Sequence, residues 1–264
     1  MTTQELFAAG KLEALHKQAA QEIRTAPRSA EARALFIQIL CLECDWDRAE
    51  TQANALLQLS PATALFCTTV SQLISAERTR GRVLSGEIGG EWVGIPPAWA
   101  PELQAARAAI ATGNSAAAET AATAVLDALP AIPVSTSGST CDWLIDGDLR
   151  LAGVVEFIKG DSYKQIPQQD IATLEIAAPT HPVEIVWPHV RITLRSGESL
   201  VGRMPGRYPM PTGCADAGLL MARNTEWQEC GSAGLYTGLG LRCWNSADGL
   251  LPLFTQGRLS FGTP

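Results

Sequence analysis

The sequence predicts an α+β protein, with a helical repeat domain over residues 1–133 and a β-rich domain over residues 141–264. Two observations support the first part: apolar side chains recur at helical spacing, and a pair of landmarks repeats along the chain. The third observation concerns the second part, where β-branched and aromatic residues replace alanine after Pro133 and Gly or Pro interrupts them at short intervals. This pattern is typical of a small, mostly antiparallel β-barrel or sandwich.

The repeated landmark is a short motif that a proline follows at a fixed distance. Gly10-Lys11 precedes Pro27, and Cys44-Asp45-Trp46 precedes Pro61 at the same spacing. The two copies are offset by about 34 residues, the period of the tetratricopeptide repeat, a helix–turn–helix unit that stacks on its neighbours. Stacked helix pairs form grooves rather than catalytic pockets, so the pattern predicts a scaffold that binds protein segments.

Individual helices follow from the apolar spacing and from capping residues. One helix is expected over residues 3–25, and Ser29 is expected to cap a second that runs through Leu42. Asp45 should cap the next helix, and Pro61 should start a long one that fades at Arg80-Gly81. The remaining expected elements are a crossover at 86–101 and helices at 101–111 and 115–129, where Gly113-Asn114 and Pro130 repeat the spacing of the landmark.

The second half should contain short strands. Strict alternation of apolar and polar residues over Val190–Arg195, then a turn and the segment 199–204, predict a hairpin. Residues 134–140 are expected to be a linker, and the absence of alternating helix and strand patterns beyond it disfavours a parallel α/β sheet. Further strands are expected at 149–159, 184–187, 219–222, 240–244 and 253–261.

Charge and composition exclude several classes of partner. Residues 1–130 carry 10 basic and 14 acidic residues and residues 131–264 carry 10 and 13, so neither half has the excess of cations that nucleic-acid binding needs. No run of about 18 apolar residues predicts a membrane span, and the N-terminus lacks the pattern of a targeting segment. Seven scattered cysteines, an odd number, favour a reducing cytoplasm over a disulfide framework.

The residues that could carry chemistry do not form a recognisable constellation. The pair Cys41 and Cys44 has redox or zinc spacing but lies at a helix end, with no second pair at zinc spacing. We interpret Asp142, Asp146 and Asp148 as turn and cap residues, because their spacing with Gly147 does not complete a calcium loop. We therefore expect no catalytic residues, no metal and no cofactor.

Motifs spread over nearly the whole chain resemble the ImpE/TagJ family of bacterial type VI secretion accessory proteins. In the first half the resemblance rests on Leu40–Ala49, where Cys44 occupies a position that is usually Gly in the family. In the second half it rests on a series of short motifs in a fixed order: Asp142-Trp-Leu144, Asp146–Arg150, Tyr163, Ile166-Pro167, Val186-Trp-Pro188, Met204–Pro209, Arg223–Trp227, Gly238–Arg242 and Leu250–Phe261.

The resemblance implies a non-enzymatic role in secretion. Members are understood to bind the contractile sheath, built from the subunits TssB and TssC and recycled by the ATPase ClpV, through an N-terminal helical segment of TssB. A helical repeat scaffold suits this role, because an amphipathic helix can lay its apolar face in a groove between helices. We expect the partner helix at apolar positions of the repeat domain, such as Phe36, Leu40 and Phe66, with an alternative groove around Trp187 and Tyr208.

Two other functions remain as alternatives. One is a generic cytoplasmic repeat adaptor unrelated to secretion, which neighbouring genes for sheath subunits would argue against. The other is a small hydrolase that uses Cys214 or Cys230 as nucleophile with His181 or His189 as base. A bound metal or a single hyper-reactive thiol would favour this second alternative.

Overall fold

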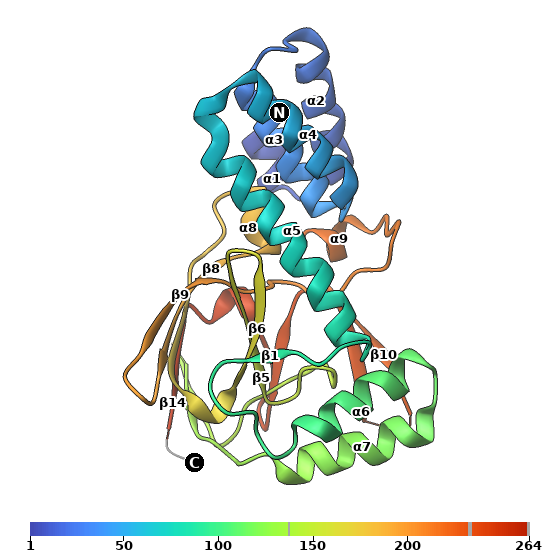
Figure 1. Cartoon of the computed structure of the whole chain (residues 1–264), viewed down its shortest axis with the longest axis vertical. Helices are drawn as coiled ribbons and strands as arrows, with labels where there is room; N and C mark the ends of the chain where they lie inside the picture. Colours follow the sequence, from blue (N-terminus) through green and yellow to red (C-terminus); the bar gives the residue numbers. More distant parts are fainter. Residues whose placement is uncertain (137, 232–233, 263–264) are drawn as a thin grey trace.

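The computed structural model describes residues 1–136, 138–231 and 234–262, and shows an elongated molecule with helices at one end and sheets at the other (Figure 1). The long helix α5 (Ala64–Leu84) runs from the N-terminal helices to the sheets. The chain is α+β, as the sequence predicts, with a helical N-terminal region and a sheet-rich C-terminal region. The other helices of the first half are α1 (Thr3–Ala8), α2 (Leu12–Thr25), α3 (Ala30–Leu42), α4 (Trp46–Leu59), α6 (Ala100–Ala111) and α7 (Ser115–Ala128).

The repeated landmark in the sequence marks helix ends. Gly10, Cys44 and Gly113 follow α1, α3 and α6, and all three have a positive φ, of 70°, 58° and 68°. A left-handed residue after the last turn ends a helix because it directs the chain away from the helix axis. Ser29 and Asp45 cap α3 and α4 through hydrogen bonds from backbone N–H groups, as expected.

Two helix boundaries differ from the prediction. The expected helix over residues 3–25 is broken into α1 and α2, because the left-handed Gly10 interrupts it. The helix that was expected to fade at Arg80-Gly81 continues to Leu84. Its last turns pack against the sheet, and Arg80 pairs with Glu156 there, a long-range contact that local sequence does not reveal.

The C-terminal region contains one large sheet and two small ones. The strand order of the large sheet is β1-β6-β5-β9-β8-β7-β14-β2-β3, and β1 and β3 lie at its two ends. Among the described strands, every pairing is antiparallel except that of β1 with β6. Its strands are β1 (Glu91–Trp92), β2 (Val134–Ser135), β3 (Thr140–Cys141), β5 (Val154–Lys159), β6 (Ser162–Pro167), β7 (Ile171–Ile176), β8 (His189–Leu194), β9 (Ser199–Arg203) and β14 (Arg258–Phe261). The small sheets are formed by β10 (Thr225–Glu229) with β11 (Tyr236–Gly240), and by β4 (Ile145–Asp146), β12 (Cys243–Ser246) and β13 (Gly249–Pro252).

The hairpin predicted around residues 190–204 is confirmed by β8 and β9, whereas several other segments differ. The expected linker 134–140 contributes β2 and β3 to the large sheet, although its residue 137 lies outside the described residues. The segments expected as strands at 184–187 and 219–222 contain helices instead, α8 (Pro182–Val186) and α9 (Ala217–Leu220). Local capping favours these helices, since Glu184 accepts the backbone N–H of Thr180 and Asp216 accepts that of Leu219.

The core is continuous between the two regions. One cluster of buried apolar side chains joins α2, α3 and α5 to Trp187 and its neighbours in α8, and to Leu220 in α9. The last helix pair, α6 and α7, lies beside the sheets and away from α1–α4 (Figure 1). The division into domains at 1–133 and 141–264 stays a prediction, and residues 263–264 lie outside the described part of the chain.

Candidate partner-binding site at the junction of helices and sheets

A buried network of ion pairs holds α5 against the large sheet. The carboxylate of Glu156 on β5 accepts bonds from Arg80 Nε at 2.7 Å, Arg242 Nη1 at 2.7 Å and the Tyr163 hydroxyl at 2.8 Å. Arg80 also donates to Glu77 Oε1 at 2.6 Å and to the Arg207 carbonyl at 2.9 Å. Burial alone would raise the pKa of Glu156, but Arg80 and Arg242 hold that pKa below its usual range, so the carboxylate stays ionised.

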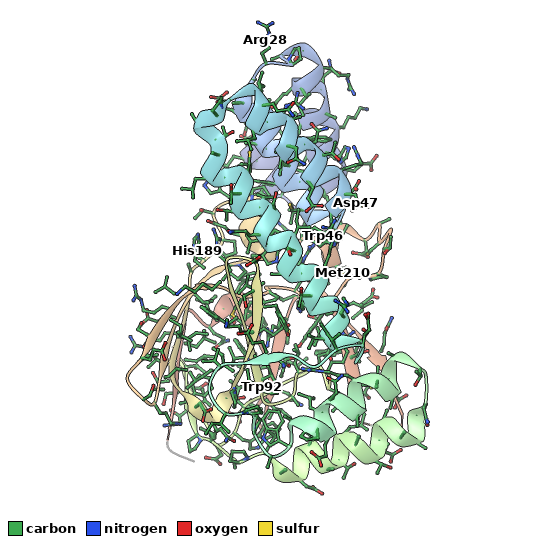
Figure 2. The ribbon with its side chains drawn as sticks, viewed as in Figure 1. Arg28, Trp46, Asp47, Trp92, His189 and Met210 are labelled. Carbon is green, nitrogen blue, oxygen red and sulfur yellow. The ribbon has the colours of Figure 1, made fainter. Side chains whose placement is uncertain are left out.

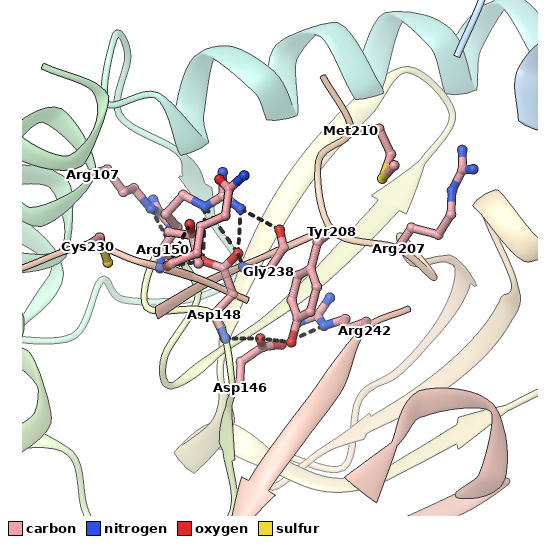
Figure 3. Close-up of polar contacts among 12 residues, drawn as sticks. Arg107, Asp146, Asp148, Arg150, Arg207, Tyr208, Met210, Cys230, Gly238 and Arg242 are labelled. Carbon is pink, nitrogen blue, oxygen red and sulfur yellow. Dashed lines mark hydrogen bonds and ion pairs between the residues drawn. The ribbon is translucent and has the colours of Figure 1, made fainter. Parts of the chain in front are cut away.

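The network continues around two aspartates (Figure 3). Arg242 Nε donates to Asp146 Oδ2 at 2.6 Å, and the Tyr208 hydroxyl lies 2.9 Å from Asp146 Oδ1. Asp148 accepts the backbone N–H of Gly238 at 2.9 Å and donates its own N–H to Asp146. Burial raises the pKa of Asp146 to about 6, against the opposing effect of Arg242. Both aspartates therefore shape a turn, as the sequence predicts, while Asp146 also compensates the buried Arg242 and Asp148 the partly buried Arg150.

Arg207 joins three elements that are distant in the sequence. Its Nη1 donates to the carbonyl of Leu42 at 2.8 Å and to the carbonyl of Leu220, at the C-terminal ends of α3 and α9. Its Nη2 lies 3.5 Å from the carbonyl of Cys41. A guanidinium is favourable at a helix C-terminus because the last carbonyls there lack backbone donors and carry partial negative charge.

Two tryptophan side chains pack against each other at the same junction between the helices and the sheets. Trp46, at the start of α4, packs against Trp187 after α8 with ring centroids 5.5 Å apart, and Trp187 Nε1 donates to Glu77 at 3.0 Å. Trp46 therefore packs across the junction rather than only within its own helix pair. A cavity of about 220 Å³ lies beside it, and Arg207 and Met210 are among the residues that line it. Figure 2 shows Trp46 and Met210 beside α5 in this part of the molecule.

A larger groove, of about 650 Å³, opens along α2. We call it the α2 groove. One wall consists of α2 residues together with Glu43, and the other is the segment from Cys214 to Leu220. His16 Nδ1 lies 2.8 Å from the Glu43 carboxylate, and the His16 ring packs edge-on against Phe36. Burial raises the pKa of Glu43, although the hydrogen bond with His16 opposes this effect.

Four of the five residues expected to contact a partner lie in the core. Leu40 and Trp187 are fully enclosed, Tyr208 is 1% exposed and Phe36 is 7% exposed. These four side chains are therefore not exposed to a partner in this structure, because Leu40 packs among the helices and the two aromatic rings pack at the junction. Phe66 is partly exposed near the start of α5. Whether a partner binds near any of these positions stays a prediction.

The residues of the hydrolase alternative lie on different elements. Cys214 lines the α2 groove, whereas Cys230 lies just after β10 and its thiol donates to the carbonyl of Leu235. His181 precedes α8, and His189 begins β8 with its Nε2 3.7 Å from Glu184. Among the hydrogen bonds of the described residues, none joins either thiol to either imidazole.

The described residues form neither a potential metal-binding group nor a helix that could span a membrane. Within those ranges, no three His, Cys, Asp or Glu side chains are grouped so that they could hold a metal ion. None of the helices there combines the length and the apolar character that crossing a bilayer requires.

Comparison with known proteins agrees with the motifs in the sequence. Residues 138–260 match the family model described as ImpE protein. The predicted family resemblance is confirmed. The chain is also 29% identical, over 99% of its own length and 91% of the relative, to the type VI secretion system accessory component TagJ of Pseudomonas aeruginosa. The ImpE match lies in the sheet-rich region, whereas the similarity to TagJ extends through the helices as well.

A solved structure shares the whole fold. The crystal structure of protein VPA1032 from Vibrio parahaemolyticus superposes with a TM-score of 0.89, covering 100% of this chain and 98% of that one, at 22% identity. Both the helical array and the sheets therefore recur together, in one arrangement, in a distant sequence.

Proposed function

We propose that this protein is an accessory component of a bacterial type VI secretion system that acts by binding other proteins, without catalysis and without a cofactor. The observation that carries the proposal is the similarity to TagJ along 99% of the chain, which includes the helical region as well as the ImpE match. The buried carboxylates support a non-catalytic role, because Glu156, Asp146 and Asp148 are each compensated by arginines. The proposed location is the cytoplasm.

The proposed partner is the sheath subunit TssB, bound through a helical segment near its N-terminus. Contact with the assembled TssB–TssC sheath and an indirect effect on ClpV follow from this proposal. We further propose that the helix pairs of the N-terminal region are tetratricopeptide-like repeats, supported by the left-handed residue that recurs after α1, α3 and α6. The sheets are proposed to form a barrel or sandwich. Such helix arrays bind a partner helix in the grooves between their own helices.

The test is calorimetric titration of the full chain with a synthetic peptide that comprises the N-terminal helix of TssB from the same gene cluster. We expect a dissociation constant in the micromolar range, roughly −8 kcal/mol. A peptide of the same composition in scrambled order is the control. The intact chain is required because the buried core is shared between the helices and the sheet-rich region, so halves of the chain lack part of their packing. Failure of both peptides to bind would contradict the proposal.

A further inference from the structure

The α2 groove has the dimensions of a helix-binding site. Glu13, Lys17, Ala20 and Arg24 lie on one face of α2 and line it, because residues three, four and seven positions apart share a helix face. From Glu13 to Arg24 the wall extends about 16 Å, the length of three helical turns. A partner helix of three to four turns would fill it.

The surfaces inside the groove allow a helix to approach closely. Leu12 and Leu220 are buried beneath the groove, so its accessible apolar surface comes from Ala20 and Ala217, which are partly exposed, and from Ala215, which is exposed. Small side chains in a groove reduce the distance between helix axes, and apolar surface gives a partner helix something to cover. The groove can therefore accept the apolar stripe of an amphipathic helix.

Charges along the groove specify the partner further. Lys17 and Arg24 are exposed, and neither has a carboxylate partner within ion-pair distance in the described part of the chain. They lie seven residues apart, which is about 10.5 Å or two turns on the same face of α2. Glu13 carries the opposite charge one turn before Lys17. Glu43 is already paired with His16, so it does not neutralise either cation.

We propose that the α2 groove holds an amphipathic partner helix that carries two carboxylates seven residues apart, facing Lys17 and Arg24. The proposal rests on the proposed function, and it identifies the α2 groove as the binding site for the helical segment of TssB. The apolar stripe of the partner helix packs on Ala20, Ala215 and Ala217. A basic residue one turn beyond the first carboxylate faces Glu13. Complementary charge along an interface fixes the register and selects the partner.

Another exposed surface on the helical region lacks charged side chains that could select a particular partner helix. The face between α4 and α5 contains a hollow of about 340 Å³ and exposes Leu57 and, near the start of α5, Leu65. Its lining is otherwise neutral apart from Asp161. Nothing on that face distinguishes one apolar partner from another, whereas the α2 groove presents charges at a fixed spacing.

The first test reverses the two cations. The double variant Lys17→Glu/Arg24→Glu is titrated with the TssB peptide beside the control Arg28→Glu/Lys159→Glu, which changes net charge equally at exposed positions outside the groove. We expect binding to weaken about tenfold or more in the groove variant and to stay within about twofold in the control. A peptide with its two matching carboxylates changed to Lys should restore binding to the groove variant.

The second test blocks the groove without altering its charge. Ala215→Trp places an indole at an exposed position on the wall opposite α2, and Ala116→Trp on α7 is the matched control. We expect Ala215→Trp to abolish measurable binding with an unchanged melting temperature, and Ala116→Trp to bind like the native chain. If the native chain binds the peptide and both groove variants bind it equally well, the groove assignment alone is wrong. If the native chain does not bind the peptide, the proposed function fails and the assignment of this partner fails with it.

Discussion

Replacing Glu156 with Gln tests whether the buried network holds the junction together. The two side chains have nearly the same shape, so the change removes a charge without leaving a cavity. Each Glu156 oxygen faces two donors, so the amide NH₂ of Gln opposes two donors whichever way it turns. Two lost charge-assisted bonds at about 1.5–3 kcal/mol each agree with the loss of about 3–5 kcal/mol typical of a broken buried ion pair. We therefore expect the free energy of unfolding to fall by about 3–5 kcal/mol.

The assay is urea and thermal denaturation of the full chain at pH 7, followed by circular dichroism. For a chain of this size the melting temperature should fall by about 2 °C for each kcal/mol, or about 6–10 °C in total. The control is Glu87→Gln, which breaks an exposed pair with Arg82 whose side chains are 58% and 54% exposed. An exposed pair contributes at most about 1 kcal/mol. Equal effects of the two substitutions would refute the role assigned to Glu156.

The pH dependence of the free energy of unfolding gives a second test of the role of Glu156. The pKa of Glu156 is lower in the folded chain than in the unfolded chain, where a Glu titrates near ~4.3. Its stabilising contribution is thus fully present above that pH and is lost as the pH falls through the folded-state pKa. The stability difference between the native chain and Glu156→Gln should narrow below about pH 4. A difference that widens in acid would contradict this assignment.

Two further predictions concern the junction and the alternative enzymatic function. Arg207→Met should lower the free energy of unfolding by about 2–4 kcal/mol, because the carbonyls of Leu42 and Leu220 lose their donor. Arg207→Lys should recover part of this loss. Urea titrations of both variants measure the two effects. Iodoacetamide at neutral pH should modify Cys230 more slowly than free cysteine, because burial raises the pKa of its thiol. Mass spectrometry of timed samples measures this rate. One thiol that reacts far faster than the others would support the alternative function as a hydrolase.

Local signals in the sequence predict the helices well and the junction poorly. The landmark at Gly10, Cys44 and Gly113 identifies three helix ends because a left-handed residue acts locally. The C-terminal turns of α5 depend instead on Arg80, whose partner Glu156 is 76 residues away. No periodicity or propensity within a short window contains that information. Short segments such as α8 and α9 also mislead, since their apolar runs fit a strand as well as a helix.

The short motifs that suggested the family have a structural explanation. Asp146, Asp148, Tyr208 and Arg242 all belong to motifs of the resemblance, and all of them lie in or against the buried network. Trp187, another such residue, is enclosed in the junction. The sequence interpretation offered Trp187 and Tyr208 as an alternative groove, because aromatic residues can line a peptide-binding face. Their burial shows that these motif residues build the junction.

Arg207 connects the N-terminal helices to the segment that forms the second wall of the α2 groove. The α2 groove has one wall from the N-terminal helices and the other from residues 214–220, within the ImpE match. Arg207 bonds to the C-terminal ends of both α3 and α9, so it fixes α9 relative to the helix that packs against α2. Neither half of the chain alone contains both walls. A groove of defined width therefore requires the helices, the sheet-rich region and the buried arginine that joins them.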